Sequence, residues 1–100
     1  MKIVYKTIPS MTLEEFAEKH DLTMIVEERR EPSDEMARYF AYFDHADIGD
    51  GCILTGAYGN GCTPESAIEQ YARTIDTKHL VVNAGNKNRV EIDVPHLITK

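Results

Sequence analysis

The sequence contains no long apolar run, only two cysteines, and fewer basic than acidic residues. A membrane helix needs about 18 consecutive apolar residues, and residues 1–6 are too short and too polar for a signal peptide. We therefore expect a cytoplasmic protein with no membrane partner. Cys52 and Cys62 lie at the start of one predicted strand and just beyond its end, too far apart to pair. We expect both to be reduced, and Cys52 to lie in the core.

Positive charge is scarce in the first half of the chain. The net charge is -6, and residues 1–50 contain six Lys and Arg against twelve Asp and Glu, whereas residues 51–100 contain five of each. Nucleic-acid binding depends on clustered Lys and Arg, so we do not expect a nucleic-acid partner. An acidic surface suits a basic protein partner. The same charge also serves solubility alone.

The sequence also lacks a recognisable catalytic, metal-binding or nucleotide-binding motif. The histidines are scattered, with no spacing that places two on one helical face: His20, His45, His79 and His96. Asp44, Asp47 and Asp50 recur at every third position, whereas an EF-hand loop needs ligands at alternate positions. We expect no metal and no cofactor, and these absences favour a non-enzymatic protein.

Two helices are predicted from their capping signals. Thr12 and Glu15 form a capping-box pattern before a helix over residues 13–20. Thr63 is a preferred N-cap residue, and Pro64 suits the first helical position of a second helix that ends near residue 75. The second helix has a predicted buried stripe at helical spacing: Ala67, Ile68, Tyr71, Ala72 and Ile75.

Strands are predicted from alternating or continuous apolar runs. They cover residues 2–8, 22–26, 37–43, 52–58, 79–83 and 89–94, with a polar connection over residues 44–51. We expect the segments 37–43 and 52–58 to be antiparallel neighbours, and Val90, Ile92 and Val94 to face inward. The predicted fold is a single α+β domain over residues 1–100, with two helices on one face of an antiparallel sheet in the order (β)αβββαββ.

A glycine-rich segment precedes the second helix. Gly59, Gly61, Cys62 and Thr63 would form an anion-binding nest of amides at the helix N-terminus, or Cys62 would act as a nucleophile activated there. The alternative reading is structural. In it Gly59 and Gly61 take the positive φ of a turn around Asn60, and Cys62 packs toward the helix.

A second candidate site combines exposed aromatics with carboxylates. In the segment 37–43, Phe40 and Tyr42 alternate with buried positions, and on an open face they would serve as protein-docking anchors. RNA stacking is the alternative, but the glycines of that motif are missing. The acidic residues expected to contact a partner are Glu14, Glu18, Glu27, Glu28, Glu31, Asp34 and Glu35.

From about residue 22 to residue 83, the chain resembles the HicB-type antitoxin domains. In that family a sheet hairpin runs into a helix that starts with the pattern G-x-T-x-E-E-A-x. The residues that match are Gly61, Thr63, Glu65, Ala67 and Ile68, whereas Ser66 replaces the second acidic residue. The resemblance implies a non-enzymatic protein that binds a small basic toxin. Many members carry a DNA-binding segment after this domain, for which there is no room before Lys100.

These observations lead to one principal hypothesis and two alternatives. The principal hypothesis is a small acidic binding or regulatory protein of bacterial or phage origin that acts by contact with a basic protein, with a homodimer left open. The first alternative is an inhibitor that mimics nucleic acid and blocks a nuclease or a defence complex. The second is an enzyme or anion-binding protein that uses residues 59–63.

Overall fold

The computed structural model describes residues 1–5, 10–31 and 33–98. The fold is α+β with mainly antiparallel sheets, as predicted, and the predicted order of helices and strands is confirmed. The structure adds three further strands to it, β4, β6 and β9. In chain order the elements are β1 (Ser10–Thr12), α1 (Leu13–Lys19), β2 (Met24–Glu28), the short 3-10 helix η1 (Glu35–Ala37), β3 (Tyr39–Phe43), β4 (Ala46–Asp50), β5 (Ile53–Gly56), β6 (Gly59–Gly61), α2 (Pro64–Ile75), β7 (His79–Val82), β8 (Val90–Asp93) and β9 (His96–Ile98).

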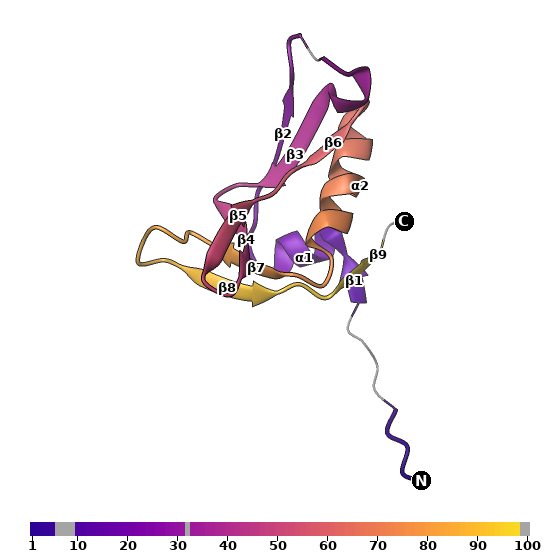
Figure 1. Cartoon of the computed structure of the whole chain (residues 1–100), viewed down its shortest axis with the longest axis vertical. Coiled ribbons are helices and arrows are strands. Elements are labelled where there is room, and N and C mark those ends of the chain that lie inside the picture. The colour runs from indigo at the N-terminus through magenta and orange to yellow at the C-terminus, as the bar shows by residue number, and fades with distance from the viewer. Residues whose placement is uncertain (6–9, 32, 99–100) are drawn as a thin grey trace.

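The strands form two larger sheets joined by one bent hairpin (Figure 1). One sheet has the order β2-β3-β6 and the other β5-β4-β7-β8, while β1 and β9 make a small parallel pair. β3 runs on into β4, and β5 runs on into β6. Ala41 pairs with Gly59 and Asp47 pairs with Gly56, so residues 42–46 on one arm face only residues 57–58 on the other. The extra residues bend the hairpin where the two sheets meet.

Both helices begin with side-chain caps. The Thr12 hydroxyl accepts a hydrogen bond from the backbone N–H of Glu15 (3.2 Å), but the Glu15 carboxylate accepts from that hydroxyl (3.0 Å) and not from the Thr12 backbone. In α2 the capping box is complete, because Ser66 donates its N–H to the Thr63 hydroxyl and accepts the Thr63 N–H, both at 3.1 Å. Both predicted helices are confirmed.

One cluster of buried side chains joins the helices to both larger sheets. α2 packs against β6 and β3, and its Tyr71 ring meets Phe43 edge-on with centroids 5.4 Å apart. The ring of Phe16 from α1 also packs near Phe43, with centroids 6.2 Å apart. Of the predicted α2 stripe, four residues are buried and Ile68 is partly buried. β7 and β8 add Leu80 and Ile92 to this core.

The predicted polar connection over residues 44–51 is wrong, because most of it forms β4. Ala46 and Ile48 pack against the core and alternate with Asp47 and Gly49, but with only two apolar side chains among glycine and aspartates this period of two is hard to recognise in the sequence. As a result, β3 pairs with β6, and the segment 53–56 pairs with β4 instead. The predicted pairing of segments 37–43 and 52–58 is corrected accordingly.

Smaller corrections concern the ends of the chain and of the strands. Residues 2–5 of the predicted first strand lie in no strand, residues 6–8 fall outside the described residues, and β1 starts at Ser10. Val90 is 50% exposed because it begins the edge strand β8, whereas Ile92 and Val94 are buried as predicted. β9 follows Pro95 and was not predicted; the Asp76 carboxylate anchors it by accepting the Leu97 N–H at 2.6 Å.

The cysteines differ from expectation in position but not in state. Both are free, as predicted, and both are exposed. The predictions that Cys52 lies in the core and that Cys62 packs toward α2 are therefore wrong. Cys52 belongs to the turn between β4 and β5, next to Gly51 with its φ of 62°.

In the part of the chain that the structure describes, no helix is long and apolar enough to cross a membrane.

Candidate functional site

The face of the β2-β3-β6 sheet that points away from α2 carries partly exposed aromatic side chains. Successive residues of a strand point to opposite faces. In β3 this places Ala41 and Phe43 in the core and Phe40 and Tyr42 on the other face, where both are partly exposed. The predicted alternation of this strand is confirmed, and it leaves two large rings only partly covered, although Tyr42 also packs against the edge of the core.

These rings form a cluster with Tyr58, which follows β5. Phe40 and Tyr42 are stacked with centroids 6.0 Å apart and an interplanar angle of 18°. Tyr58 meets Phe40 edge-on at 6.0 Å and 72°, and 52% of Tyr58 is exposed. Both geometries are favourable for aromatic pairs. The three rings therefore hold one another in place while keeping apolar surface open to solvent.

Arg29, just after β2, completes this cluster. Its guanidinium carbon lies 4.4 Å from the Phe40 ring centroid and 5.9 Å from that of Tyr58. It also donates a hydrogen bond to the side-chain oxygen of Asn60 at 2.8 Å and one to the Ala37 carbonyl. A cation over an aromatic face is attracted by the ring quadrupole. We call Arg29, Phe40, Tyr42 and Tyr58 the aromatic face.

Tyr42 is held by a carboxylate from the neighbouring strand. Its hydroxyl donates a 2.8 Å hydrogen bond to Glu27 of β2. This hydrogen bond is the main cause of a raised Tyr42 pKa, with smaller effects from desolvation and from the charges of Glu27 and Asp44. The hydrogen bond to Glu27 also limits the positions that the Tyr42 ring can take on the sheet.

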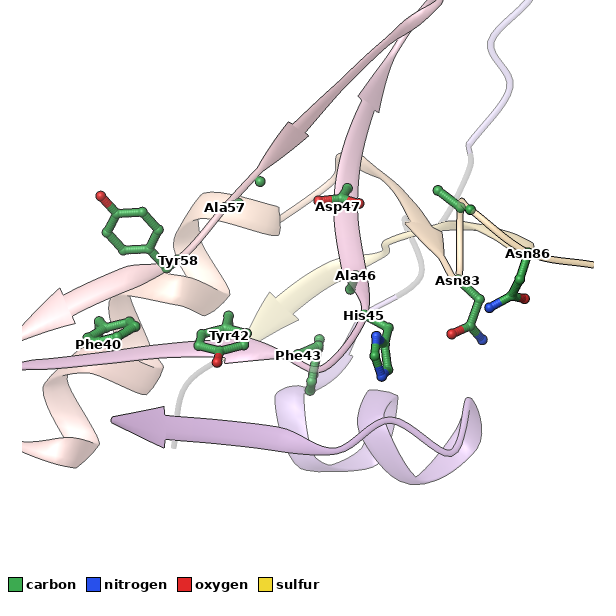
Figure 2. A pocket seen from close by; sticks show the side chains of 13 residues that line it. Phe40, Tyr42, Phe43, His45, Ala46, Asp47, Ala57, Tyr58, Asn83 and Asn86 are labelled. Atoms are coloured by element: carbon green, nitrogen blue, oxygen red, sulfur yellow. The ribbon is translucent and has the colours of Figure 1, made fainter. Parts of the chain in front are cut away.

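A hollow of about 690 Å³ lies beside the aromatic face, at the bend of the hairpin (Figure 2). Figure 2 shows Phe40, Tyr42 and Tyr58 gathered on one side, with Asn83 and Asn86 on the other and Asp47 between them. The volume is within the range of small-ligand sites. The hollow also lies open to solvent, so it suits a protruding group of a larger partner.

The wall opposite the aromatics is fixed by two residues with left-handed backbone conformations. His45 has a φ of 60° and Asn83 a φ of 56°, values that are uncommon outside glycine but tolerated by Asn and His. The Asn83 N–H donates to the His45 carbonyl at 2.9 Å. This bond ties the loop after β7 to the bend and so sets the width of the hollow.

The predicted acidic contact residues lie in two places. Glu14 and Glu18 are on α1, and the others lie at the far end of β2 and around η1, near the opposite end of the molecule (Figure 1). Several are engaged within the chain. Arg38 pairs with Glu28 at 3.3 Å and with Glu35 at 2.8 Å, and Asp34 caps η1 by accepting the Met36 N–H at 2.9 Å. The pairing leaves less free negative charge for mimicry of nucleic acid.

The residues of the predicted anion-binding site make structural contacts with α2. Gly59 and Gly61 do not take positive φ, so the predicted turn around Asn60 is wrong. They form β6, and a Cβ on either would overlap the backbone of α2. The N–H groups of Thr63 and Ser66 are taken by the capping box. Two of the amides at the start of α2 are therefore already used, and Cys62 lies exposed beside them.

Sequence reasoning identified Phe40 and Tyr42 but missed the residues that complete the site. Arg29, Asp47 and Tyr58 come from three other segments and meet these rings only through the strand pairing. The signal that could have found them is the pairing of β3 with β6, whereas the sequence predicts pairing with residues 52–58. Over residues 1–5, 10–31 and 33–98, no group of three or more His, Cys, Asp or Glu side chains is arranged to hold a metal ion.

Comparisons with known proteins add no assignment. No protein-family model and no curated protein matches the sequence, and no solved structure matches the fold. The geometry of the aromatic face and the hollow is thus the basis for a functional proposal.

Proposed function

We propose that this chain is a non-enzymatic binding protein that acts through protein–protein contact, and that its partner docks on the aromatic face. The observation that carries the proposal is the partly exposed cluster of Phe40, Tyr42 and Tyr58 on the sheet face opposite α2. Aromatic residues and Arg are enriched at interface centres and supply much of the binding energy. Rings fixed in this way lose little entropy on binding.

The partner we propose is basic. The chain has a net charge of -6, and Glu27 and Asp47 flank the aromatic rings. Opposite charges on two proteins accelerate their encounter, and salt weakens this effect. The resemblance to HicB-type antitoxin domains supports the same proposal, since such domains bind a small basic toxin. It also supports a bacterial or phage origin and a cytoplasmic location, which are part of this proposal.

Affinity capture with matched variants tests the proposal. The wild type, the double variant Phe40→Ala/Tyr58→Ala and the control Ile53→Ala are immobilised and exposed to lysate of the source organism. Ile53 is also an exposed apolar residue (67%) but lies at the hairpin end, outside the aromatic face. We expect a basic protein to be retained by the wild type and the control and lost by the double variant. Equal retention by all three would overturn the aromatic face as the docking site.

A further inference from the structure

The hollow beside the aromatic face combines a ring wall with a carboxylate. Tyr42 and Tyr58 line one side, and Asp47 of β4 lines the hollow between them and the loop after β7 (Figure 2). Asp47 is partly buried and makes no ion pair with any other residue that the structure describes. A partly buried carboxylate without a cationic neighbour favours a bound cation.

The aromatic face already holds one guanidinium. Arg29 lies over Phe40 at 4.4 Å and bonds to the Asn60 side-chain oxygen. The hollow offers rings and side-chain amides to a second cation, from Tyr42, Tyr58 and Asn83, and adds the Asp47 carboxylate. The side-chain oxygen of Asn86, which also lines the hollow, already accepts the Asn88 N–H at 2.7 Å. The contacts of Arg29 with Phe40 and Asn60 show that groups of this kind hold a guanidinium in this fold.

We propose that the hollow receives an arginine side chain of the docking partner, with its guanidinium against the Tyr42 and Tyr58 rings and paired with Asp47. This inference rests on the proposed protein contact and adds the group that is recognised. Arginine fits better than lysine because its planar guanidinium stacks on rings and bonds to a carboxylate with two parallel N–H groups. The acidic character of the chain supports a cationic occupant and disfavours a phosphate.

A titration with small peptides tests this inference on the whole chain. The probes are acetyl-Gly-Arg-Gly-amide and the same peptide with citrulline, which keeps the planar shape but removes the charge. The readout is NMR shift changes of the Tyr42 and Tyr58 rings and of the Asn83 and Asn86 side-chain amides. We expect the arginine peptide to shift these signals, and the citrulline peptide to leave them unchanged at equal concentration.

Charge-matched variants sharpen the test. Asp47→Asn keeps the shape of the side chain, and we expect it to weaken arginine-peptide binding about tenfold, as for a hydrogen bond to a charged group. Asp50→Asn removes the same charge from the exposed end of the same strand, away from the hollow, and should bind as the wild type does. The backbone NMR spectrum of each variant shows whether it is folded.

Several results would overturn the inference. They are an absence of shifts with the arginine peptide, equal shifts with citrulline, and equal binding by Asp47→Asn and the wild type. Shifts produced by uridine monophosphate but not by arginine would assign the rings to base stacking instead. Loss of the captured partner in Phe40→Ala/Tyr58→Ala but not in Asp47→Asn would leave the docking proposal standing and reject the arginine site alone.

Discussion

Gly59 of β6 lies directly against the backbone of Tyr71 in α2. A Cβ at this position would overlap the Tyr71 backbone nitrogen and the Ala67 carbonyl oxygen. One turn earlier on α2, Gly61 makes a similar approach to the Ala67 backbone. The contact brings Tyr71 to Phe43 at 5.4 Å, so the two glycines set the distance between the helix and the sheet whose other face carries the aromatic cluster.

We expect Gly59→Ala to destabilise the protein strongly. The new methyl group meets helix backbone, which moves less easily than a side chain, so the loss should be about 3 kcal/mol or more. The free energy of unfolding in urea measures it. Gly85→Ala is the control because no atom lies within 4 Å of its added Cβ and its φ is not positive. A loss at Gly59 no larger than that at Gly85 would contradict the close packing.

Tyr71→Phe should leave stability unchanged or raise it by up to about 1 kcal/mol. The Tyr71 hydroxyl is fully buried and has no hydrogen-bond partner among the described residues. Desolvation is the main cause of the raised pKa of Tyr71. The nearby Phe43 backbone lowers this pKa in part, although its contact with the hydroxyl does not have the geometry of a normal hydrogen bond. Removal of an unpaired buried hydroxyl costs little, whereas Tyr71→Ala should lose about 3–5 kcal/mol, as other core aromatics do. Thermal unfolding of the two variants distinguishes these outcomes.

His79 should make the stability depend on pH. Its ring nitrogens lie 2.9 Å from Glu91 and 2.9 Å from Asp93, and these hydrogen bonds raise its pKa above the ordinary value of 6.5, the Glu91 bond most. The His79 bond in turn lowers the pKa of Glu91, with a smaller effect of Arg89. A histidine with a raised folded pKa stabilises the protein fully below 6.5 and loses this effect as the pH rises through the folded value.

Melting temperatures at pH 6 and pH 8 test this linkage. We expect the wild type to lose stability between these values and the variant His79→Gln to lose less, because the glutamine cannot become charged. The control is His45→Asn, which removes an exposed histidine from the bend and tolerates its positive φ. If the melting temperature of His79→Gln depends on pH as that of the wild type does, the His79 contacts do not contribute to the pH dependence of stability.

The thiols test the alternative in which the chain is an enzyme. Cys52 and Cys62 are both exposed, so both should be alkylated in the native protein without denaturant. If Cys62 were a nucleophile activated at the start of α2, it would react much faster than Cys52. We expect comparable rates, measured by mass spectrometry after timed iodoacetamide treatment. A rate for Cys62 that exceeds that of Cys52 a hundredfold would favour the enzyme.

The helices could be predicted from the sequence because their signals are local. Thr12 and Thr63 mark the helix starts, and the spacing of Ala67, Tyr71 and Ile75 marks the buried stripe. β3 was predicted for a similar reason, since its alternation is complete within the strand. β4 could not be predicted in the same way, because only Ala46 and Ile48 of its five residues are apolar, and its glycine and two aspartates have the composition of a loop.

The candidate site could be predicted only in part because it depends on strand pairing. Phe40 and Tyr42 follow from alternation, but Tyr58 and Asp47 reach them through a hairpin in which residues 42–46 face residues 57–58. No short sequence pattern in either strand of the hairpin specifies that five residues on one side face two on the other. The sequence predicts a turn at the glycines of β6 for a related reason: the closeness of Gly59 to Tyr71 depends on the packing of α2 and not on neighbours in the sequence.

The affinity of a purified captured partner for the wild type and for Phe40→Ala/Tyr58→Ala tests the central claim most directly. If the aromatic face is the docking site, the double variant should bind at least about 30-fold more weakly, as expected when interface anchors worth 2 kcal/mol or more are removed. Ile53→Ala should bind as the wild type does. Equal affinities of the double variant and the wild type, with both shown to be folded, would contradict docking on this face.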